Sequence, residues 1–398
     1  MEVYFKEKSI EKIVVEEIRP VFGAKITAIG VGGGGSNAIS NLADSVGIHQ
    51  YVKIVAANTD KQHLDGSPAP YKIRLGEELT KGLGAGMRPE VGEASAQESR
   101  DQIREVLEGS DIVFIATGLG GGTGTGASPV IAEIAKEIGA LTVSIVTKPF
   151  KGEGPKKAKL AEGGLAKLRE VSDSIIVVPN DRLRSVIPPT AGIRESFKIV
   201  DDVLVRAVSG IANVMLNYGP NNMNVDFADV RTVMGHKGLA LMGIGEAEGQ
   251  GAASEALKKA LTSPLLDNVS IEGAMGILLN FEFSEDHPFG ELEDAMDLIH
   301  DYVHEDADVK FGTISCENMS TGQVRVTIIA TGFEKETLSK AEKESFREEK
   351  QKQEAIRSMK NEIDIRGHFE SGRGYQDIQT IDLDYPAVIR KNSNKPQQ

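Results

Sequence analysis

This chain of 398 residues has one cysteine, no tryptophan and fewer basic than acidic residues, and these features argue against several classes of protein. One cysteine, Cys316, allows no intramolecular disulfide and no cysteine-rich zinc site, which fits a reducing compartment. The 59 acidic residues outnumber the 45 lysines and arginines, and the net charge of −14 argues against a nucleic-acid-binding protein. No apolar run approaches the ~18 residues of a membrane span. We therefore expect a cytoplasmic protein that neither binds nucleic acid nor inserts directly into a membrane.

Glycine, in contrast, is abundant, with 43 copies, and two loops concentrate it: GVGGGGSN (30–37) and GLGGGTGTGAS (118–128). The first contains a G-x-G-x-x-G pattern at Gly30, Gly32 and Gly35, which indicates either a dinucleotide site or only a tight turn into a helix. The second loop favours another kind of site, since a dinucleotide fold needs one such loop. Neither loop has the lysine of a P-loop, so backbone N–H groups and the Thr123 and Thr125 hydroxyls would hold the phosphates of a nucleoside triphosphate. Mg²⁺ would neutralise that triphosphate.

The first half of the chain has the pattern of a doubly wound parallel α/β sheet. Short, β-branched apolar runs alternate with stretches of helical spacing. The expected strands are 25–30, 52–58, 111–117, 141–147 and 173–179, and the expected helices are 36–45, 90–108, 126–138 and 156–171. In such sheets ligands bind at the carboxyl ends of the strands, where both glycine loops fall.

The second half predicts a central helix and a smaller α+β domain. The central helix covers 194–216, the further strands 238–245, 276–283, 307–315 and 323–332, and the further helices 226–235, 250–262 and 289–302. After residue 333 the chain is charged and poor in apolar residues, as a disordered linker is. We expect an N-terminal extension (1–22), a nucleotide-binding domain (23–193), the helix (194–217), a second domain (218–333), a linker (334–380) and a docking peptide (381–398).

Two carboxylates, Asp226 and Asp229, stand at i and i+3 where a helix is expected to begin, next to Asn224. The spacing places the two carboxylates on one face. Helix capping explains such residues without any chemistry, since Asn and Asp favour N-caps and first turns. From the residues alone, capping is the preferred interpretation.

Several motifs resemble the tubulin and FtsZ family of filament-forming GTPases. GGGTGTG (120–126) is the tubulin-type signature, and residues 24–333 resemble the bacterial branch of the family almost end to end. The segments that carry the resemblance are GVGGGGSNA (30–38), ANTD (57–60), LTKGLGAGMRPEVG (79–92), TKPFKGEG (147–154), PNDRL (179–183), NVDFADVRTVM (224–234) and DLDYPAVIRK (382–391).

The resemblance implies a guanine-nucleotide site for GTP or GDP, with roles residue by residue. Phe197 would stack on the purine, Asp201 would accept from its N–H edge, and Glu153 would accept from the ribose hydroxyls. Lys157 stands where the family commonly has arginine, and Ser36, where a further glycine is frequent, adds a hydroxyl able to cap the helix. The expected phosphate- and nucleotide-facing residues are Gly33, Gly34, Gly35, Ser36, Asn37, Asn58, Ala85, Gly86, Gly121, Gly122, Thr123, Gly124, Thr125, Gly126, Lys157 and Asn180.

The resemblance also implies that the catalytic groups act between subunits. Asn224, Asp226 and Asp229 would polarise water or a cation at the γ-phosphate of the next subunit in a head-to-tail filament. Phosphates and water would hold Mg²⁺, and no protein metal site is expected. The peptide Asp382–Lys391 would bind membrane-tethering and regulatory proteins at a mid-cell division ring.

Two alternatives remain open from the residues. One is an NAD-dependent oxidoreductase built on the Gly30, Gly32 and Gly35 loop, with Asp60 as its ribose-binding acid. The other is a scaffold that binds nucleotide without hydrolysing it, against which the presence of both Asp226 and Asp229 argues.

Overall fold

The computed structural model describes residues 24–43, 51–184, 187–188, 190–216, 223, 225–236, 238–266, 271–284, 287–316 and 319–333. All of these residues belong to one compact unit. The expected N-terminal extension, the linker, the docking peptide Asp382–Lys391 and the catalytic candidate Asn224 lie outside the described residues.

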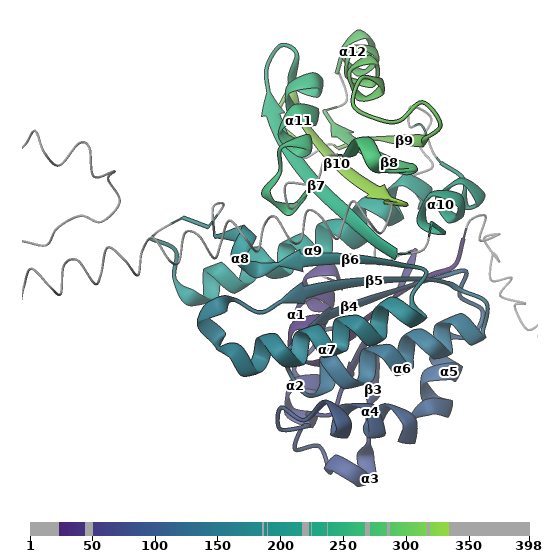
Figure 1. Cartoon of the computed structure of the whole chain (residues 1–398), viewed down its shortest axis with the longest axis vertical. Coiled ribbons are helices and arrows are strands. Elements are labelled where there is room, and N and C mark those ends of the chain that lie inside the picture. Colours follow the sequence, from purple (N-terminus) through teal and green to yellow (C-terminus); the bar gives the residue numbers. More distant parts are fainter. Residues whose placement is uncertain are drawn as a thin grey trace, which may run out of the picture. The chain divides into compact units, whose positions relative to one another are not determined.

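A parallel sheet forms the first half of the described chain, which confirms the expected doubly wound fold (Figure 1). The strands are, in spatial order, β3 (Tyr71–Arg74), β2 (Val52–Asn58), β1 (Ile26–Val31), β4 (Ile112–Gly118), β5 (Leu141–Lys148) and β6 (Ser174–Pro179). All neighbouring pairs among them run parallel. Strand β3 was not expected, because four residues in which only one side chain is fully buried give too short a pattern.

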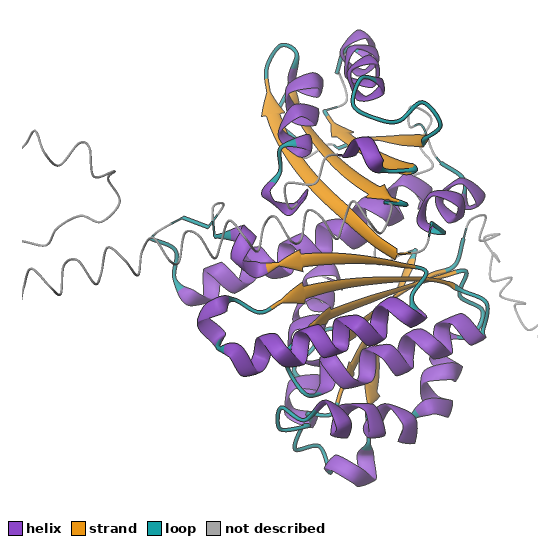
Figure 2. Cartoon of the chain, viewed as in Figure 1, coloured by secondary structure: helices purple, strands orange, loops and turns teal. Residues whose placement is uncertain are grey.

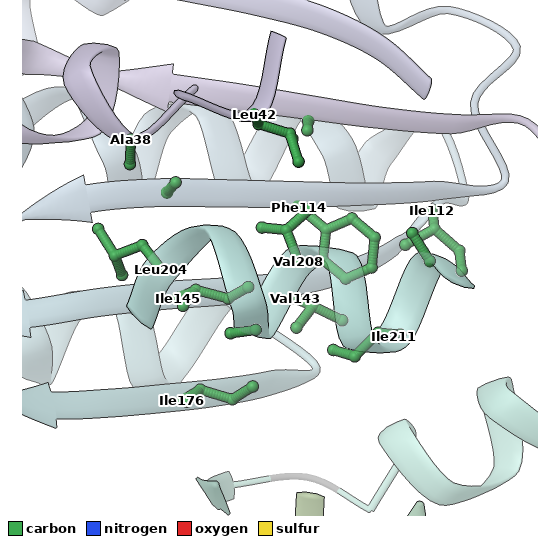
Figure 3. Close-up of a cluster of buried hydrophobic side chains, with 14 of the residues drawn as sticks. Ala38, Leu42, Ile112, Phe114, Val143, Ile145, Ile176, Leu204, Val208 and Ile211 are labelled. Atoms are coloured by element: carbon green, nitrogen blue, oxygen red, sulfur yellow. The ribbon is translucent and has the colours of Figure 1, made fainter. Parts of the chain in front are cut away.

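Helices cover both faces of this sheet, which explains why its strands are apolar on both faces. Apolar side chains of α1 (Gly32–Ala43), α2 (Lys61–Asp65) and α9 (Ile193–Leu216) form the core on one face. Those of α4 (Pro89–Glu98), α5 (Arg100–Leu107), α6 (Thr123–Glu137) and α7 (Pro155–Val171) form the core on the other. Figure 3 shows α1 and α9 converging on the first face, with Leu42 and Val208 near Phe114 of β4.

The second half continues the same sheet instead of forming a separate one. Strand β7 (Gly238–Glu248) pairs parallel with β6 and antiparallel with β10 (Gln323–Thr331), and β8 (Gly276–Phe283) and β9 (Asp308–Ser315) follow. The described strands therefore make one ten-stranded sheet (Figure 2). Helices α11 (Ala252–Leu261) and α12 (Phe289–His300) pack on this half, and α10 (Phe227–Met234) precedes β7. The domain boundaries set from the sequence stay predictions.

Three expected helices begin or end elsewhere in the structure. The helix expected at 36–45 begins at Gly32, and that expected at 126–138 begins at Thr123. The helix expected at 90–108 is two helices that meet at Ser99. The Ser99 hydroxyl accepts a hydrogen bond from Gly76 N at 3.0 Å, which ties this junction to the segment after β3.

Candidate functional site

Most of the predicted site residues lie at the edge of the sheet where the parallel strands end. Between β1 and β4 the strand order changes direction, because the chain passes from β1 to β2 on one side and from β4 to β5 on the other. In sheets of this kind the ligand binds at such a switch point. The two glycine loops follow these two strands, so the fold brings both loops to its natural binding position.

The two glycine loops pack closely against one another and against neighbouring backbone, and several of their glycines are needed for these contacts. A Cβ atom on Gly32, whose φ is +70°, would lie 2.8 Å from the backbone nitrogen of Gly124. A Cβ atom on Gly35 would lie 2.2 Å from the carbonyl oxygen of Ala116, and one on Gly126 would lie 1.9 Å from that of Pro89. These glycines allow backbone segments to pack, which is a structural role.

Gly33 and Gly121 have a different environment, because a Cβ atom on either would meet nothing within 4 Å. Gly33 is in the first turn of α1, and Gly121 is two residues before α6 begins. Helix N-termini carry unpaired N–H groups and a positive dipole end, which attract phosphate. Two such N-termini with open backbone beside them fit the phosphate groups of a nucleotide.

The two threonine hydroxyls assigned to the phosphates make hydrogen bonds within the protein. Thr125 is 2% exposed, and its Oγ1 accepts from Gly120 N at 2.8 Å. Thr123 Oγ1 lies 2.6 Å from Thr59 Oγ1 in a buried hydrogen bond. Both side chains therefore shape the loop and tie it to the end of β2. The role of Thr123 and Thr125 toward a ligand stays a prediction.

Ser36 does not cap α1, because that helix begins four residues earlier. Its hydroxyl is buried and has no hydrogen-bond partner among the described residues. Asn180, which follows β6, is also buried, and its Oδ1 has no partner in that part of the chain. Asn58 ends β2, and its Oδ1 accepts from Asp60 N at 3.2 Å. Asn37 is exposed on α1 and lines a cavity of about 400 Å³.

A loop of unusual backbone conformation presses Ala85 against the second glycine loop. Lys81 and Met87 have φ of +51° and +57°, a region that few residues other than glycine occupy. Ala85 is buried, and a Cβ atom on Gly122 would lie 2.8 Å from the Cβ of Ala85. The next residue, Gly86, is exposed. The loop therefore places Ala85 and Gly86 beside the expected phosphate position.

Glu153 and Lys157 are bound to one another in the structure. Lys157 Nζ donates to Glu153 Oε2 at 2.9 Å, and Glu153 Oε1 accepts from Phe150 N at 2.8 Å. Lys157 is also close to the second glycine loop, because a Cβ atom on Gly120 would lie 3.0 Å from the Lys157 carbonyl oxygen. The roles of Glu153 and Lys157 toward a nucleotide stay predictions.

The N-terminal part of α9 provides an aromatic ring and an unusual carboxyl group. Phe197 is 43% exposed and packs edge to face on Phe150, with ring centroids 5.9 Å apart. The two rings line a cavity of about 670 Å³. Burial, together with repulsion from Asp202, raises the pKa of Asp201 to about 7. Two N–H donors of a guanine edge would favour its charged form.

Asp226 and Asp229 lie far from the glycine loops of their own chain. Helix α9 starts after β6 has ended, at the carboxyl edge, whereas β7 begins beside the first residue of β6, because Gly238 pairs with Ser174. The segment before β7 is therefore at the opposite edge. Val225 N donates to Val214 O near the end of α9, and Asp201 and Val214 are ~20 Å apart along that helix at about 1.5 Å per residue.

Both carboxylates are engaged at the start of α10, as capping predicts. Asp226 is the N-cap, and its Oδ1 accepts from Asp229 N at 2.8 Å. Asp229 Oδ1 is 2.8 Å from Lys310 Nζ of β9, a contact that sequence reasoning missed. No local pattern indicated it, because 81 positions separate the two residues (310 − 229).

Two kinds of feature are missing from the ranges that the structure describes. No group of three or more histidine, cysteine, aspartate or glutamate side chains is arranged to hold a metal ion there. In the same ranges no helix has both the length and the apolar surface that crossing a bilayer requires.

Comparison with known proteins finds matches on both halves of the chain. The family model for the Tubulin/FtsZ family GTPase domain matches residues 25–188, and the model for the FtsZ family C-terminal domain matches residues 238–334. The cell division protein FtsZ of Helicobacter pylori strain J99 is 53% identical over 329 residues, covering 82% of this chain and 85% of the relative. That of Aquifex aeolicus is 48% identical over 320 residues, covering 80% and 86%. A solved FtsZ dimer from M. jannaschii superposes with a TM-score of 0.73 at 43% identity, covering 78% and 88%.

These matches decide between the open alternatives. The dehydrogenase interpretation is wrong, because the model that matches residues 25–188 is that of a GTPase domain. The interpretation as a non-hydrolysing scaffold is also wrong, because the matching domain is a GTPase domain. On the fold, the site and these relatives, the chain belongs to the tubulin/FtsZ family and is a GTP-binding GTPase of the cell-division cytoskeleton.

Proposed function

We propose that GTP binds across the two glycine loops and is hydrolysed only where a second subunit supplies its α10 segment. One observation carries this proposal: the phosphate-binding features and the carboxylates Asp226 and Asp229 lie at opposite edges of one sheet. Asp226 and Asp229 follow the far end of α9, which is ~20 Å along the helix from Asp201, and from there they cannot position water on the nucleotide of their own chain. Head-to-tail stacking of identical subunits brings the two edges together.

The nucleotide-binding roles in this proposal are those that the resemblance implies, and the open backbone at the carboxyl edge supports them. Gly33 and Gly121 allow the closest approach of backbone N–H groups to phosphate, since nothing fills the space beside them. Glu153 accepts from the ribose, Phe197 stacks on the base, and Asp201 accepts from guanine. Mg²⁺ is held mainly by phosphate oxygens and water, in keeping with its preference for a partly hydrated shell.

In the reaction, this chain's residues supply position and charge. Glycine-loop N–H groups hold the triphosphate of one subunit. The Asp229 carboxylate of the next subunit accepts a hydrogen bond from the attacking water, while Asp226 and Asn224 orient water or a cation beside it. Loss of the γ-phosphate then removes part of the contact between the subunits, so hydrolysis weakens the filament.

We further propose that the filaments form in the cytoplasm at the mid-cell division ring and are linked there to the membrane by other proteins. The segment Asp382–Lys391 is the docking peptide in this proposal, because it is a short apolar island in a charged tail.

Mixing two inactive variants tests the central proposal. Asp229→Ala should bind GTP and turn it over at least 100-fold more slowly, the usual scale for losing a positioned acid–base group. Gly33→Asp should not bind GTP, because a carboxylate in the open space would repel the phosphates. Phosphate release from the mixture should exceed that of either variant alone, since a Gly33→Asp subunit can offer its Asp229 to the nucleotide of its neighbour.

Co-sedimentation of the two variants is the control, because it shows that mixed filaments form. Mixed filaments with no recovered phosphate release would contradict hydrolysis between subunits. Normal turnover by Asp229→Ala alone would remove that residue from the site.

A further inference from the structure

Strand β9 is at the edge of the sheet and binds the segment around Met223, which leads to Asp226 and Asp229. Thr313 N donates to Met223 O at 2.9 Å, and Met223 N donates to Thr313 Oγ1 at 2.8 Å. A Cβ atom on Gly312 would lie 3.1 Å from Met223 O and 3.0 Å from Val214 Cγ1. Gly312 therefore allows the strand to lie directly against this segment and against α9.

Lys310 makes a second attachment, from the face of β9 on which Gly312 lies. Residues 310 and 312 lie on one side of the strand, since side chains alternate along it, whereas Val309 and Phe311 pack into the apolar core on the other side. Lys310 Nζ is 2.8 Å from Asp229 Oδ1. Because Asp229 N also donates to Asp226 Oδ1, one chain of contacts links the lysine to both carboxylates.

The charges around Lys310 keep it protonated and paired. The hydrogen bond to Asp229 raises the pKa of Lys310 above its ordinary value; burial acts against it, and the nearby charges of Asp229, Asp308 and Asp226 raise it further. The ion pair is partly exposed, and such pairs contribute little to folding stability. Any functional effect of the pair would therefore lie in the direction that it gives the carboxylate.

We propose that Lys310 is a positioning residue: its ammonium group fixes the Asp229 carboxylate in the orientation that meets the nucleotide of the next subunit. The inference rests on the proposed function, in which Asp229 acts between subunits. The lysine donates to Oδ1, so Oδ2 is the oxygen assigned to water. Without Lys310, the carboxylate rotates about its own bonds and spends less time in the productive orientation.

The test compares Lys310→Met, Lys310→Arg and the double variant Asp229→Ala/Lys310→Met. Lys310→Met should lower kcat about 10-fold, with unchanged GTP affinity and unchanged sedimentation of filaments, because misplacement of a catalytic group acts on the chemical step. Lys310→Arg should recover most of that loss, since it restores the cation. Lys258→Met, at an exposed lysine of α11, is the matched control and should behave as the unaltered protein.

The double variant shows whether Lys310 acts through Asp229. Residues that act through one another have non-additive effects, so the double variant should be no slower than Asp229→Ala alone. A further 10-fold loss in the double variant, a normal kcat for Lys310→Met, or failure of Lys310→Met to sediment would each overturn the inference. Normal turnover by Asp229→Ala would instead overturn the proposed function, and the positioning role with it.

Discussion

Single glycines in the two loops have separate tasks, which their shared position in the motifs does not reveal. Gly32, Gly35 and Gly126 let neighbouring backbone segments approach, whereas Gly33 and Gly121 face open space. The sequence identified the two loops but led us to expect Gly35 and Gly126, like Gly33 and Gly121, to face the nucleotide. Whether a glycine can be replaced depends on atoms that are distant along the chain, such as Pro89 O, which leaves no room for a side chain at Gly126.

Alanine should therefore affect protein stability at the first kind of glycine and GTP binding at the second. Gly126→Ala forces a Cβ atom against Pro89 O and should lower the free energy of unfolding by about 1–3 kcal/mol, as overpacking does. Gly33→Ala should leave that free energy unreduced and weaken GTP binding, because its methyl group occupies the space beside the phosphates. Thermal unfolding without nucleotide and a GTP titration measure the two effects, and the same loss of stability in both variants would contradict this division.

Asp201 predicts a pH dependence of nucleotide binding. Its pKa of about 7 in the ligand-free protein lies above the ordinary value, so the neutral form is favoured and the charged acceptor is populated only as pH rises. If guanine requires the carboxylate, GTP affinity should fall about 10-fold from pH 8 to pH 6 through this group.

Asp201→Asn is the control for that titration, because it removes the ionisation and retains a carbonyl acceptor. The pH dependence that remains in this variant belongs to the nucleotide and to other groups. Identical pH profiles for the variant and the unaltered protein would show that Asp201 does not titrate at the base.

At the scale of secondary-structure elements, the start of α10 is compatible with both roles that the sequence left as alternatives. Asp226 caps the helix through Asp229 N, as the residue preferences predicted. The same cap fixes the first turn on which Asp229 stands, so capping and a catalytic role do not exclude one another. The position of α10 at the edge of the sheet opposite the glycine loops then determines that these carboxylates can reach only the nucleotide of another subunit in the proposed reaction.

Substitutions at Asp226 separate the cap from the charge. Asp226→Asn keeps an acceptor for Asp229 N, so the free energy of unfolding should stay within about 0.5 kcal/mol while GTP turnover falls. Asp226→Ala removes the acceptor too and should cost about 1 kcal/mol of stability in addition. Chemical denaturation and phosphate release measure the two quantities, and unimpaired turnover in Asp226→Asn would leave Asp226 with the capping role alone.

Considered as a whole molecule, the protein carries half of its proposed reaction centre at each edge of one sheet. Specific GTPase activity should therefore rise with protein concentration above a threshold, because assembly must precede hydrolysis. Phosphate release measured across a dilution series, with light scattering in parallel, follows both processes. A chain lacking residues 382–391 is a suitable control and should show the same concentration dependence, and a specific activity independent of concentration would contradict the proposal.

The sequence by itself determined the fold class, the family and the chemistry of the two loops, because glycine patterns and strand–helix alternation are local along the chain. Only the tertiary structure decided which glycines are open, where α10 lies relative to the loops, and that Lys310 meets Asp229. It also showed that the two halves share one sheet through the pairing of β6 with β7. These features arise from contacts between residues distant in sequence, and such contacts produce no periodic pattern in the amino-acid sequence.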